Sequence, residues 1–159
     1  MPFLIMGKIT DLNVTGRLKG KFEALLGDAH RYIVAGILVR LGFVVSMVAV
    51  KGEPYDLLVY AFEKPEGREI LLRCQTKASS KGGLNFTPKH NDLIIGVDMR
   101  TLALYLIPTA FLANWGDSRA FSKLQPLKNN WDVLLNWNDE YLERLRRQLE
   151  PQRKVPNKP

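Results

Sequence analysis

The spacing of apolar residues predicts one long helix followed by a series of strands. Between Asp28 and Leu41, apolar side chains recur every three or four positions, as in a helix that packs on a sheet. Gly42 follows directly and is the residue type that most often ends a helix. The apolar run 43–50 is nearly continuous, which predicts a strand covered on both faces. Further strands are expected at residues 55–60, 71–77, 93–98 and 101–107.

Polar segments between these runs predict how the elements are connected. Residues 63–67 contain Pro and Gly and predict a hairpin turn, residues 99–100 predict a second one, and residues 78–86 predict a flexible polar loop. Short helices are expected from Pro108 to Asn114 and over residues 131–137, and a longer helix over residues 140–150, capped by Asn138 or Asp139. The pattern therefore predicts an α/β fold with a mixed central sheet of about five strands flanked by helices.

The length of 159 residues predicts a single domain. We expect this domain to span residues 1–150, with a basic arm at 1–26, a core at 27–108 and a helical C-terminal piece at 109–150. Residues 151–159 are rich in Pro, Lys and Arg and predict a disordered basic tail.

The formal net charge of +7 indicates a polyanionic partner. Cys74 is the single cysteine, so an internal disulfide is excluded, and the sequence has no Cys/His cluster of the kind that binds zinc. No apolar run approaches the roughly 20 residues that a membrane-spanning helix needs. We therefore expect a cytoplasmic protein without a membrane segment, in which Cys74 is a small core residue.

Three polar residues interrupt the apolar pattern of the first hairpin. Asp56 stands at the head of one strand, and Gln75 and Lys77, two positions apart on the next, point to the same face. Carboxylate and amide oxygens suit a hard divalent cation, and a lysine beside such an ion can orient water or neutralise charge on a phosphate. In the alternative interpretation, Asp56 accepts local amide hydrogens, and Gln75 and Lys77 form the solvent face of an edge strand.

The sequences Glu53-Pro54-Tyr55-Asp56 and Gln75-Thr76-Lys77 resemble the motifs of the PD-(D/E)XK nuclease superfamily. The Gln variant is similar to the branch that contains small intron-encoded homing endonucleases, and the resemblance runs from about Gly27 to Pro108. It implies a restriction-endonuclease-like core and Mg²⁺-dependent cleavage of DNA. By this resemblance Asp56 and Gln75 would hold the Mg²⁺ ion and Lys77 would assist the nucleophile.

One position departs from the family pattern. The family's helix commonly brings a glutamate to the active site, and alignment on residues 41–43 places Arg31 there instead. Glu23 or Asp28 can take its place, and we name Glu23 as the fourth catalytic candidate. Alternatively, Glu23 and His30 are solvated surface residues.

We expect nucleic acid to contact Lys51, Ser79, Ser80 and Lys81 near the predicted site. The adjacent Gly82 and Gly83 would let backbone amides approach a phosphate, although the same composition also describes a plain surface loop. The favoured function is a Mg²⁺-dependent endodeoxyribonuclease that acts on duplex DNA. A nuclease fold that binds DNA without cleaving it is the alternative, and RNA remains open as the partner. Because one site cuts one strand, a dimer or tetramer is expected.

Overall fold

A five-stranded mixed sheet forms the centre of the computed structural model, which describes residues 29–48, 55–86 and 91–150. The strand order is β1-β2-β3-β5-β6; β3 and β5 are parallel and every other neighbouring pair is antiparallel. The predicted α/β fold with a mixed sheet is confirmed. The strands are β1 (Val45–Met47), β2 (Leu57–Glu63), β3 (Arg68–Ser79), β5 (Leu93–Asp98) and β6 (Ala103–Pro108).

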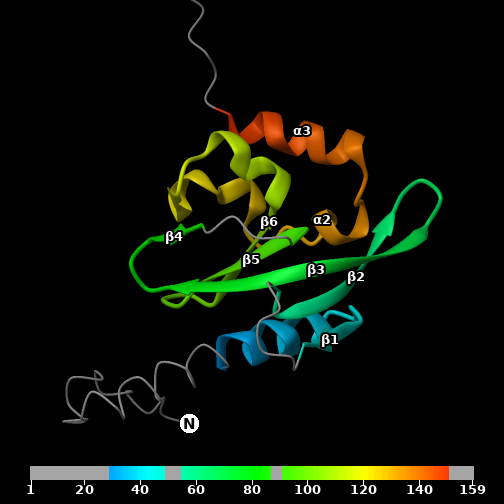
Figure 1. The fold of residues 1–159 in the computed structure, drawn as a ribbon, viewed down its shortest axis with the longest axis horizontal. Helices are drawn as coiled ribbons and strands as arrows, with labels where there is room; N and C mark the ends of the chain where they lie inside the picture. The colour runs from blue at the N-terminus through cyan, green and yellow to red at the C-terminus, as the bar shows by residue number, and fades with distance from the viewer. Residues whose placement is uncertain (1–28, 49–54, 87–90, 151–159) are drawn as a thin grey trace, which may run out of the picture.

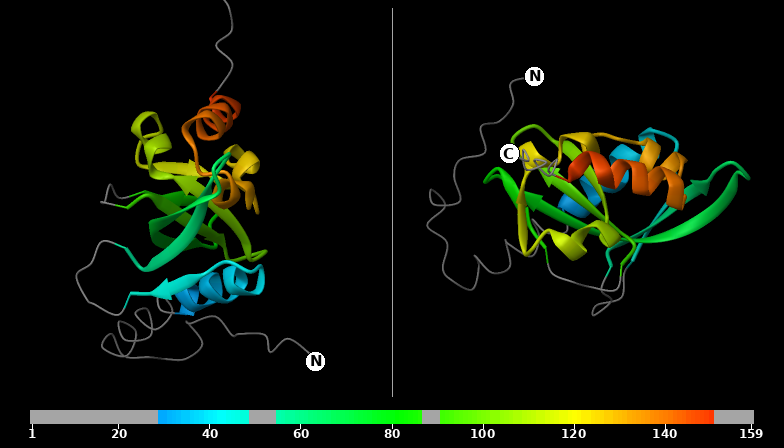
Figure 2. Two further views of the ribbon diagram at one scale, coloured as in Figure 1. Left: turned by 90° about the vertical axis from the view of Figure 1, so that its right-hand side faces the viewer. Right: turned by 90° about the horizontal axis from the view of Figure 1, so that it is seen from above.

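Helical segments cover the sheet on both sides. The helix at residues 29–40 lies on one side, and the C-terminal helices lie on the other (Figure 1), which gives three layers when the molecule is turned (Figure 2). The N-terminal helix buries Val34 and Leu38. It ends as predicted at Gly42, which has a φ of 91°, with the Phe43 amide donating to the Leu38 carbonyl. Leu41, the last apolar residue of the predicted helix pattern, is exposed, because it already lies beyond the last helical turn.

The C-terminal layer is built mainly from short helices. Asn138 caps the longest of them by accepting a hydrogen bond from the Tyr141 amide at 2.9 Å, as expected for an N-cap. Tyr105 of β6 stacks on Phe121 with 4.7 Å between ring centroids, which ties the sheet to this layer. The helical segments are η2 (Thr109–Asn114), η3 (Phe121–Lys123), η4 (Gln125–Leu127), α2 (Asp132–Leu135) and α3 (Asp139–Leu149).

Two expectations about the strands are wrong. The run 43–50 was expected to be covered on both faces, but β1 is an edge strand of three residues and Val44 beside it is 63% exposed. The segment 78–86 is not one loop. Ala78 and Ser79 continue β3, because they remain paired with Val97 and Asp98 of β5. Gly83–Asn85 then forms β4, which pairs with β7 (Ser118–Ala120) in a separate two-stranded sheet.

Gly96 sits where β5 meets β4, opposite Lys77 of β3. A Cβ atom at this position would lie 2.2 Å from Cδ1 of Leu84, a side chain that is only 2% exposed and therefore has little room to move. We expect Gly96→Ala to lower the free energy of unfolding by about 1–3 kcal/mol, the usual cost of overpacking a core. Urea denaturation measures this directly. The penalty should shrink in a Leu84→Ala background, and an equal penalty in both backgrounds would contradict the assigned contact.

Candidate active site

Asp56 lies one residue before β2 and is held against β3. Its amide donates to the Cys74 carbonyl at 2.8 Å, and the pairing of Leu57 with Cys74 places Asp56 beside Gln75 in the same register. Its Oδ2 atom accepts hydrogen bonds from the Thr76 amide at 2.9 Å and from the Thr76 hydroxyl at 3.1 Å. Asp56 thus satisfies a local amide, as the alternative interpretation expects. That role occupies one of its two carboxylate oxygens.

Gln75 lies in the third strand of the five and is only 7% exposed. The idea that it belongs to the solvent face of an edge strand is therefore wrong. Its Oε1 atom accepts a hydrogen bond from Nδ2 of Asn91 at 3.3 Å. An amide oxygen has two lone pairs, so this bond leaves Oε1 with capacity for a second partner.

Lys77 is half-buried and lines a cleft of about 520 Å³. Three of the four expected nucleic-acid contacts, Ser79, Ser80 and Lys81, line the same cleft. The end of β3 and the start of β4 therefore lie together around this one cleft. The fourth expected contact, Lys51, and the catalytic candidate Glu23 lie outside the described residues.

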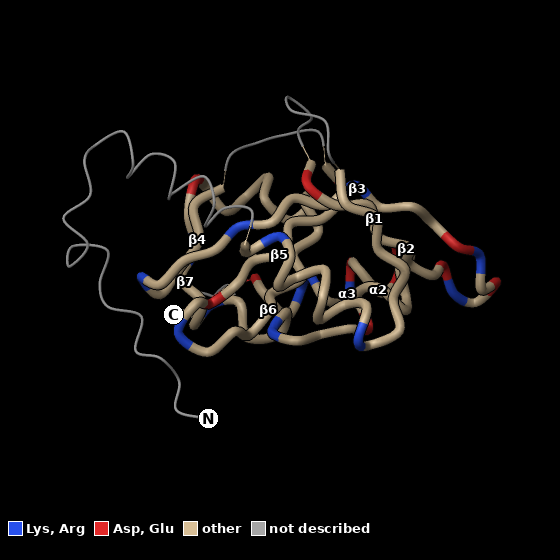
Figure 3. Tube along the Cα trace, turned by 90° about the horizontal axis from the view of Figure 1, so that it is seen from below, with Lys and Arg blue, Asp and Glu red and all other residues tan. Residues whose placement is uncertain are grey.

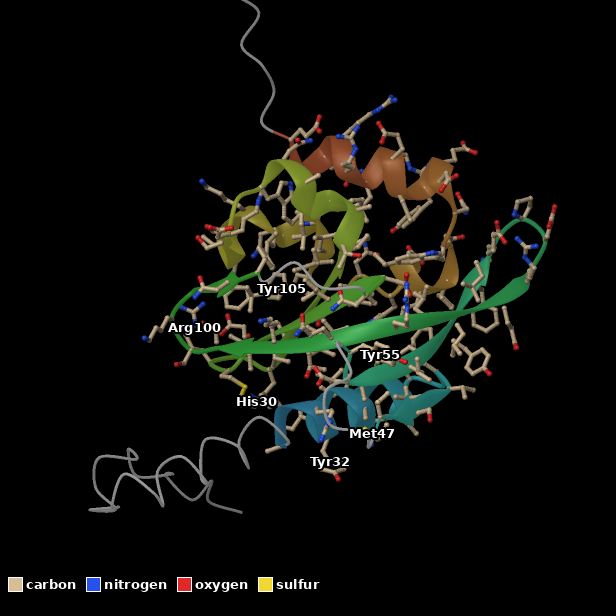
Figure 4. All side chains as sticks on the ribbon, in the orientation of Figure 1. His30, Tyr32, Met47, Tyr55, Arg100 and Tyr105 are labelled. Atoms are coloured by element: carbon tan, nitrogen blue, oxygen red, sulfur yellow. The ribbon has the colours of Figure 1, made fainter. Side chains whose placement is uncertain are left out.

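His30 enters the same cleft from the N-terminal helix (Figure 4). Partial burial lowers the pKa of its imidazole below the usual value of 6.5, because the charged form loses hydration. His30 is therefore neutral at pH 7, with one ring nitrogen able to accept a proton or a hydrogen bond. The alternative view of His30 as a solvated surface residue stays open, since its side chain is half-buried at the edge of this cleft.

Arg31, the residue aligned with the family's helix glutamate, lies close to the Asp56 end of β2. Its Nη1 donates to the Val48 carbonyl at 3.3 Å, and the Val48 amide in turn donates to the Asp56 carbonyl at 3.0 Å. The helix thus presents position 31 to the same end of the hairpin as Asp56. A guanidinium there brings positive charge where the resemblance implies a carboxylate.

Polar residues at the start of β5 support the site from the other side. Asp92 pairs with Arg73, accepting at 2.8 Å from its amide and at 3.1 Å from its guanidinium. Burial alone would raise the pKa of Asp92, but the hydrogen bonds and the charge of Arg73 lower it overall, so Asp92 stays ionised. This pair fixes the segment that presents Asn91 to Gln75. The sequence interpretation missed Asn91, Asp92 and Thr76, although two polar residues directly before a wholly buried strand are a usable signal.

The oxygen atoms of Asp56 and Gln75 are of the kind that Mg²⁺ takes as ligands. Within the described ranges, no three His, Cys, Asp or Glu side chains lie close enough together to form a metal site. Mg²⁺, however, is often held by one or two carboxylates with substrate phosphates and water as the remaining ligands. Asp56 offers one such carboxylate, and the register places the Gln75 amide, a neutral oxygen donor, beside it.

Charged residues of both signs lie at both ends of the molecule. Figure 3 shows Lys and Arg together with acidic residues at the end that carries β4 and β7, and the β2–β3 turn at the other end is mixed as well. The cleft with Lys77 and Lys81 belongs to the first end. In the part of the chain that the structure describes, no helix has the length and apolarity needed to cross a membrane.

The architecture matches a solved structure. The bacterial homing endonuclease I-Ssp6803I superposes on 74% of this chain and 94% of its own, with a TM-score of 0.54 and 17% sequence identity. The fold is similar to that of a homing endonuclease. Neither the family models nor the curated proteins compared with the sequence match it. At this identity the likeness concerns the fold, and the PD-(D/E)XK assignment stays a prediction from the motif.

Proposed function

We propose that this chain is a metal-dependent endonuclease that cleaves duplex DNA. The observation that carries the proposal is the position of Asp56, Gln75 and Lys77 at one end of the β2–β3 hairpin, on a fold similar to that of a homing endonuclease. The adjoining cleft contains Lys77 and Lys81 and suits a phosphate backbone. The net charge of +7 points to the same kind of partner.

Each residue has a distinct role in this proposal. Asp56 and the Gln75 amide oxygen would hold Mg²⁺, which supplies Lewis-acid polarisation of the scissile phosphate and a more acidic bound water. Thr76 keeps the Asp56 carboxylate in place through its amide and hydroxyl. Asn91 orients the Gln75 amide. Lys77 orients the attacking water or neutralises charge that develops on the phosphate.

Gln75→Glu tests the ligand role without relying on activity. The substitution places a carboxylate at a position that is 7% exposed, which should lower the thermal unfolding temperature in EDTA because a buried charge is costly. Mg²⁺ at 100 times the variant's dissociation constant should stabilise the variant by about 2.7 kcal/mol, and the same concentration should stabilise wild type less. Thermal unfolding with and without Mg²⁺ is the measurement. The matched control is Gln148→Glu on the exposed face of α3, and an equal Mg²⁺ effect in both variants would remove Gln75 from the ligand set.

A DNA-binding protein without catalysis is the second candidate, and Arg31 is the observation that favours it. Its guanidinium is anchored beside the Asp56 end of the site, where a second carboxylate would assist metal binding. We expect duplex affinity to fall with salt at a log–log slope steeper than about −2 under either function, since each neutralised phosphate contributes about −0.9. A filter-binding titration across salt concentrations gives this slope. A shallower slope would argue against any DNA-directed function.

Cleavage assays on the same samples separate the two candidates. Salt-dependent binding with cleavage in Mg²⁺ supports the nuclease, and binding without cleavage under any divalent metal supports the second candidate. In the latter case Arg31→Glu should create metal-dependent nicking, because it restores the carboxylate. If that variant stays inactive, the alignment of the helix on the nuclease family is mistaken. Assembly into a dimer or tetramer remains a prediction that analytical ultracentrifugation can check.

A further inference from the structure

The pair β4–β7 forms a ribbon that is longer than its named strands. Gly83 pairs with Ala120, Leu84 with Arg119 and Asn85 with Ser118. One more backbone hydrogen bond closes each end: the Phe86 amide donates to the Asp117 carbonyl at 2.7 Å, and the Phe121 amide donates to the Gly82 carbonyl at 2.9 Å. The ribbon therefore spans residues 82–86 and 117–121.

The two faces of this ribbon differ sharply in chemistry. On the inner face Leu84, Phe86 and Phe121 are buried, and Leu84 packs against Gly96 of the central sheet. The outer face alternates with it, as side chains on strands do. It consists of two cross-strand pairs, Gly83–Ala120 and Asn85–Ser118.

Three of the four residues on the outer face have small side chains, so few atoms project from it. A Cβ on Gly83 would lie 2.8 Å from the Arg119 carbonyl oxygen, so glycine is required for the close approach of the two strands. Ala120 and Ser118 are exposed and add little bulk, and Asn85 is exposed and is the longest side chain on this face. Its amide offers both a donor and an acceptor to a neighbouring molecule.

A cleft that contains basic residues borders the ribbon on each side. The β4 side borders the cleft that contains Lys77 and Lys81, and the β7 side borders a second cleft of about 710 Å³ that contains Arg119 and Lys123 together with the acidic Glu150. In the second cleft the Arg119 guanidinium lies 4.0 Å from the Trp115 ring centroid and donates to the Leu149 carbonyl at 2.8 Å. Lys81 and Lys123 are both exposed, Lys81 in the first cleft and Lys123 in the second, and both lie near the end of the ribbon where the Phe121 amide donates to the Gly82 carbonyl.

We propose that the outer face of the β4–β7 ribbon enters the major groove of duplex DNA and that Asn85 reads an adenine there. A two-stranded ribbon fits the major groove, and asparagine pairs with the N6 and N7 atoms of adenine through two hydrogen bonds. The basic residues on either side suit the two phosphate backbones that border a groove, which position a protein without specifying sequence. This inference rests on the proposed DNA partner and adds the element that selects the sequence.

Duplex RNA does not fit the same geometry. Its major groove is deep and too narrow for side chains to read. The ribbon therefore favours DNA over RNA as the partner. Duplex RNA of the selected sequence should compete poorly with the DNA.

Selection of bound duplexes from a randomised library tests the proposal. The experiment is carried out in EDTA with wild type, Asn85→Ala and Lys123→Ala, after circular dichroism has confirmed that each variant is folded. Wild type should select a sequence with an A·T pair at one position that Asn85→Ala no longer selects. The lost discrimination at that position should be roughly 5- to 150-fold. Lys123→Ala should instead weaken binding to all sequences alike. It should also make the log–log slope of affinity against salt shallower by about 1, which is the contribution of one phosphate contact.

The outcomes that overturn the proposal are distinct from failure of the proposed function. If Asn85→Ala selects the same sequence as wild type, or weakens all sequences equally, the ribbon does not read bases. If wild type binds duplex DNA with no sequence preference, the ribbon assignment is likewise wrong while the nuclease proposal stands. If wild type binds no duplex DNA, both fail together.

Discussion

Asp56→Asn is expected to abolish DNA cleavage and leave the protein as stable as wild type. Asparagine keeps an oxygen that can accept the hydrogen bond that Oδ2 now takes from the Thr76 amide at 2.9 Å. It loses the negative charge of the single carboxylate among the proposed Mg²⁺ ligands. We expect the cleavage rate under saturating DNA to fall at least about 100-fold, because metal assistance contributes several kcal/mol to such reactions. Single-turnover cleavage and urea denaturation measure the two properties separately.

Asp56→Ala provides the comparison that separates structure from chemistry. It removes the acceptor for Thr76 and should lower the free energy of unfolding by about 1–3 kcal/mol, the cost of leaving a partly buried donor without a partner. It should be as inactive as Asp56→Asn. If Asp56→Asn cleaves like wild type, the carboxylate serves only to hold Thr76, and the metal site lies elsewhere.

Lys77→Ala is the second substitution with a large expected effect. Lys77 lines the cleft at the end of β3. We propose that its ammonium orients the attacking water there or neutralises the charge that develops on the phosphate. Removing one such electrostatic contact typically slows the chemical step by about 100- to 1,000-fold. Affinity for duplex DNA should change far less, because Lys77 would be one of many basic residues that contact phosphates. Single-turnover rates and binding constants for the same duplex report the two effects.

Lys81→Ala is the matched control, since Lys81 lines the same cleft and is exposed. It should weaken binding and leave the rate at saturating DNA unchanged. If Lys81→Ala and Lys77→Ala lower the cleavage rate at saturating DNA by the same factor, and the affinity for the duplex as well, Lys77 acts as another phosphate contact. Its assignment to the chemical step is then wrong.

Local patterns were sufficient to predict much of the fold. The N-terminal helix and its end at Gly42, the two hairpins and the Asn138 cap all depend on residues within a few positions of one another. The mixed sheet of five strands was also predicted correctly. The exposure of Val44 was not predicted, since the apolar pattern cannot tell an edge strand from a central one.

The remaining errors concern contacts between distant segments. The pairing of Gly83–Asn85 with Ser118–Ala120 joins residues more than 30 positions apart, and three-residue strands leave almost no pattern in the sequence. The bond of Asp56 to Thr76 was not predicted, because it joins residues 20 positions apart and depends on the register between β2 and β3. The role of Asn91 depends on β5 lying beside β3, a fact of topology that its own neighbours do not reveal.

Plasmid nicking with and without Mg²⁺ tests the proposed nuclease most directly. Supercoiled DNA is incubated with wild type and with Lys77→Ala, each in Mg²⁺ and in EDTA, and the relaxed and linear products are quantified. The proposal predicts conversion by wild type in Mg²⁺ alone, at least about 100 times faster than by Lys77→Ala. Equal conversion by both proteins, or conversion by wild type that persists in EDTA, would contradict a metal-dependent site built from Asp56, Gln75 and Lys77.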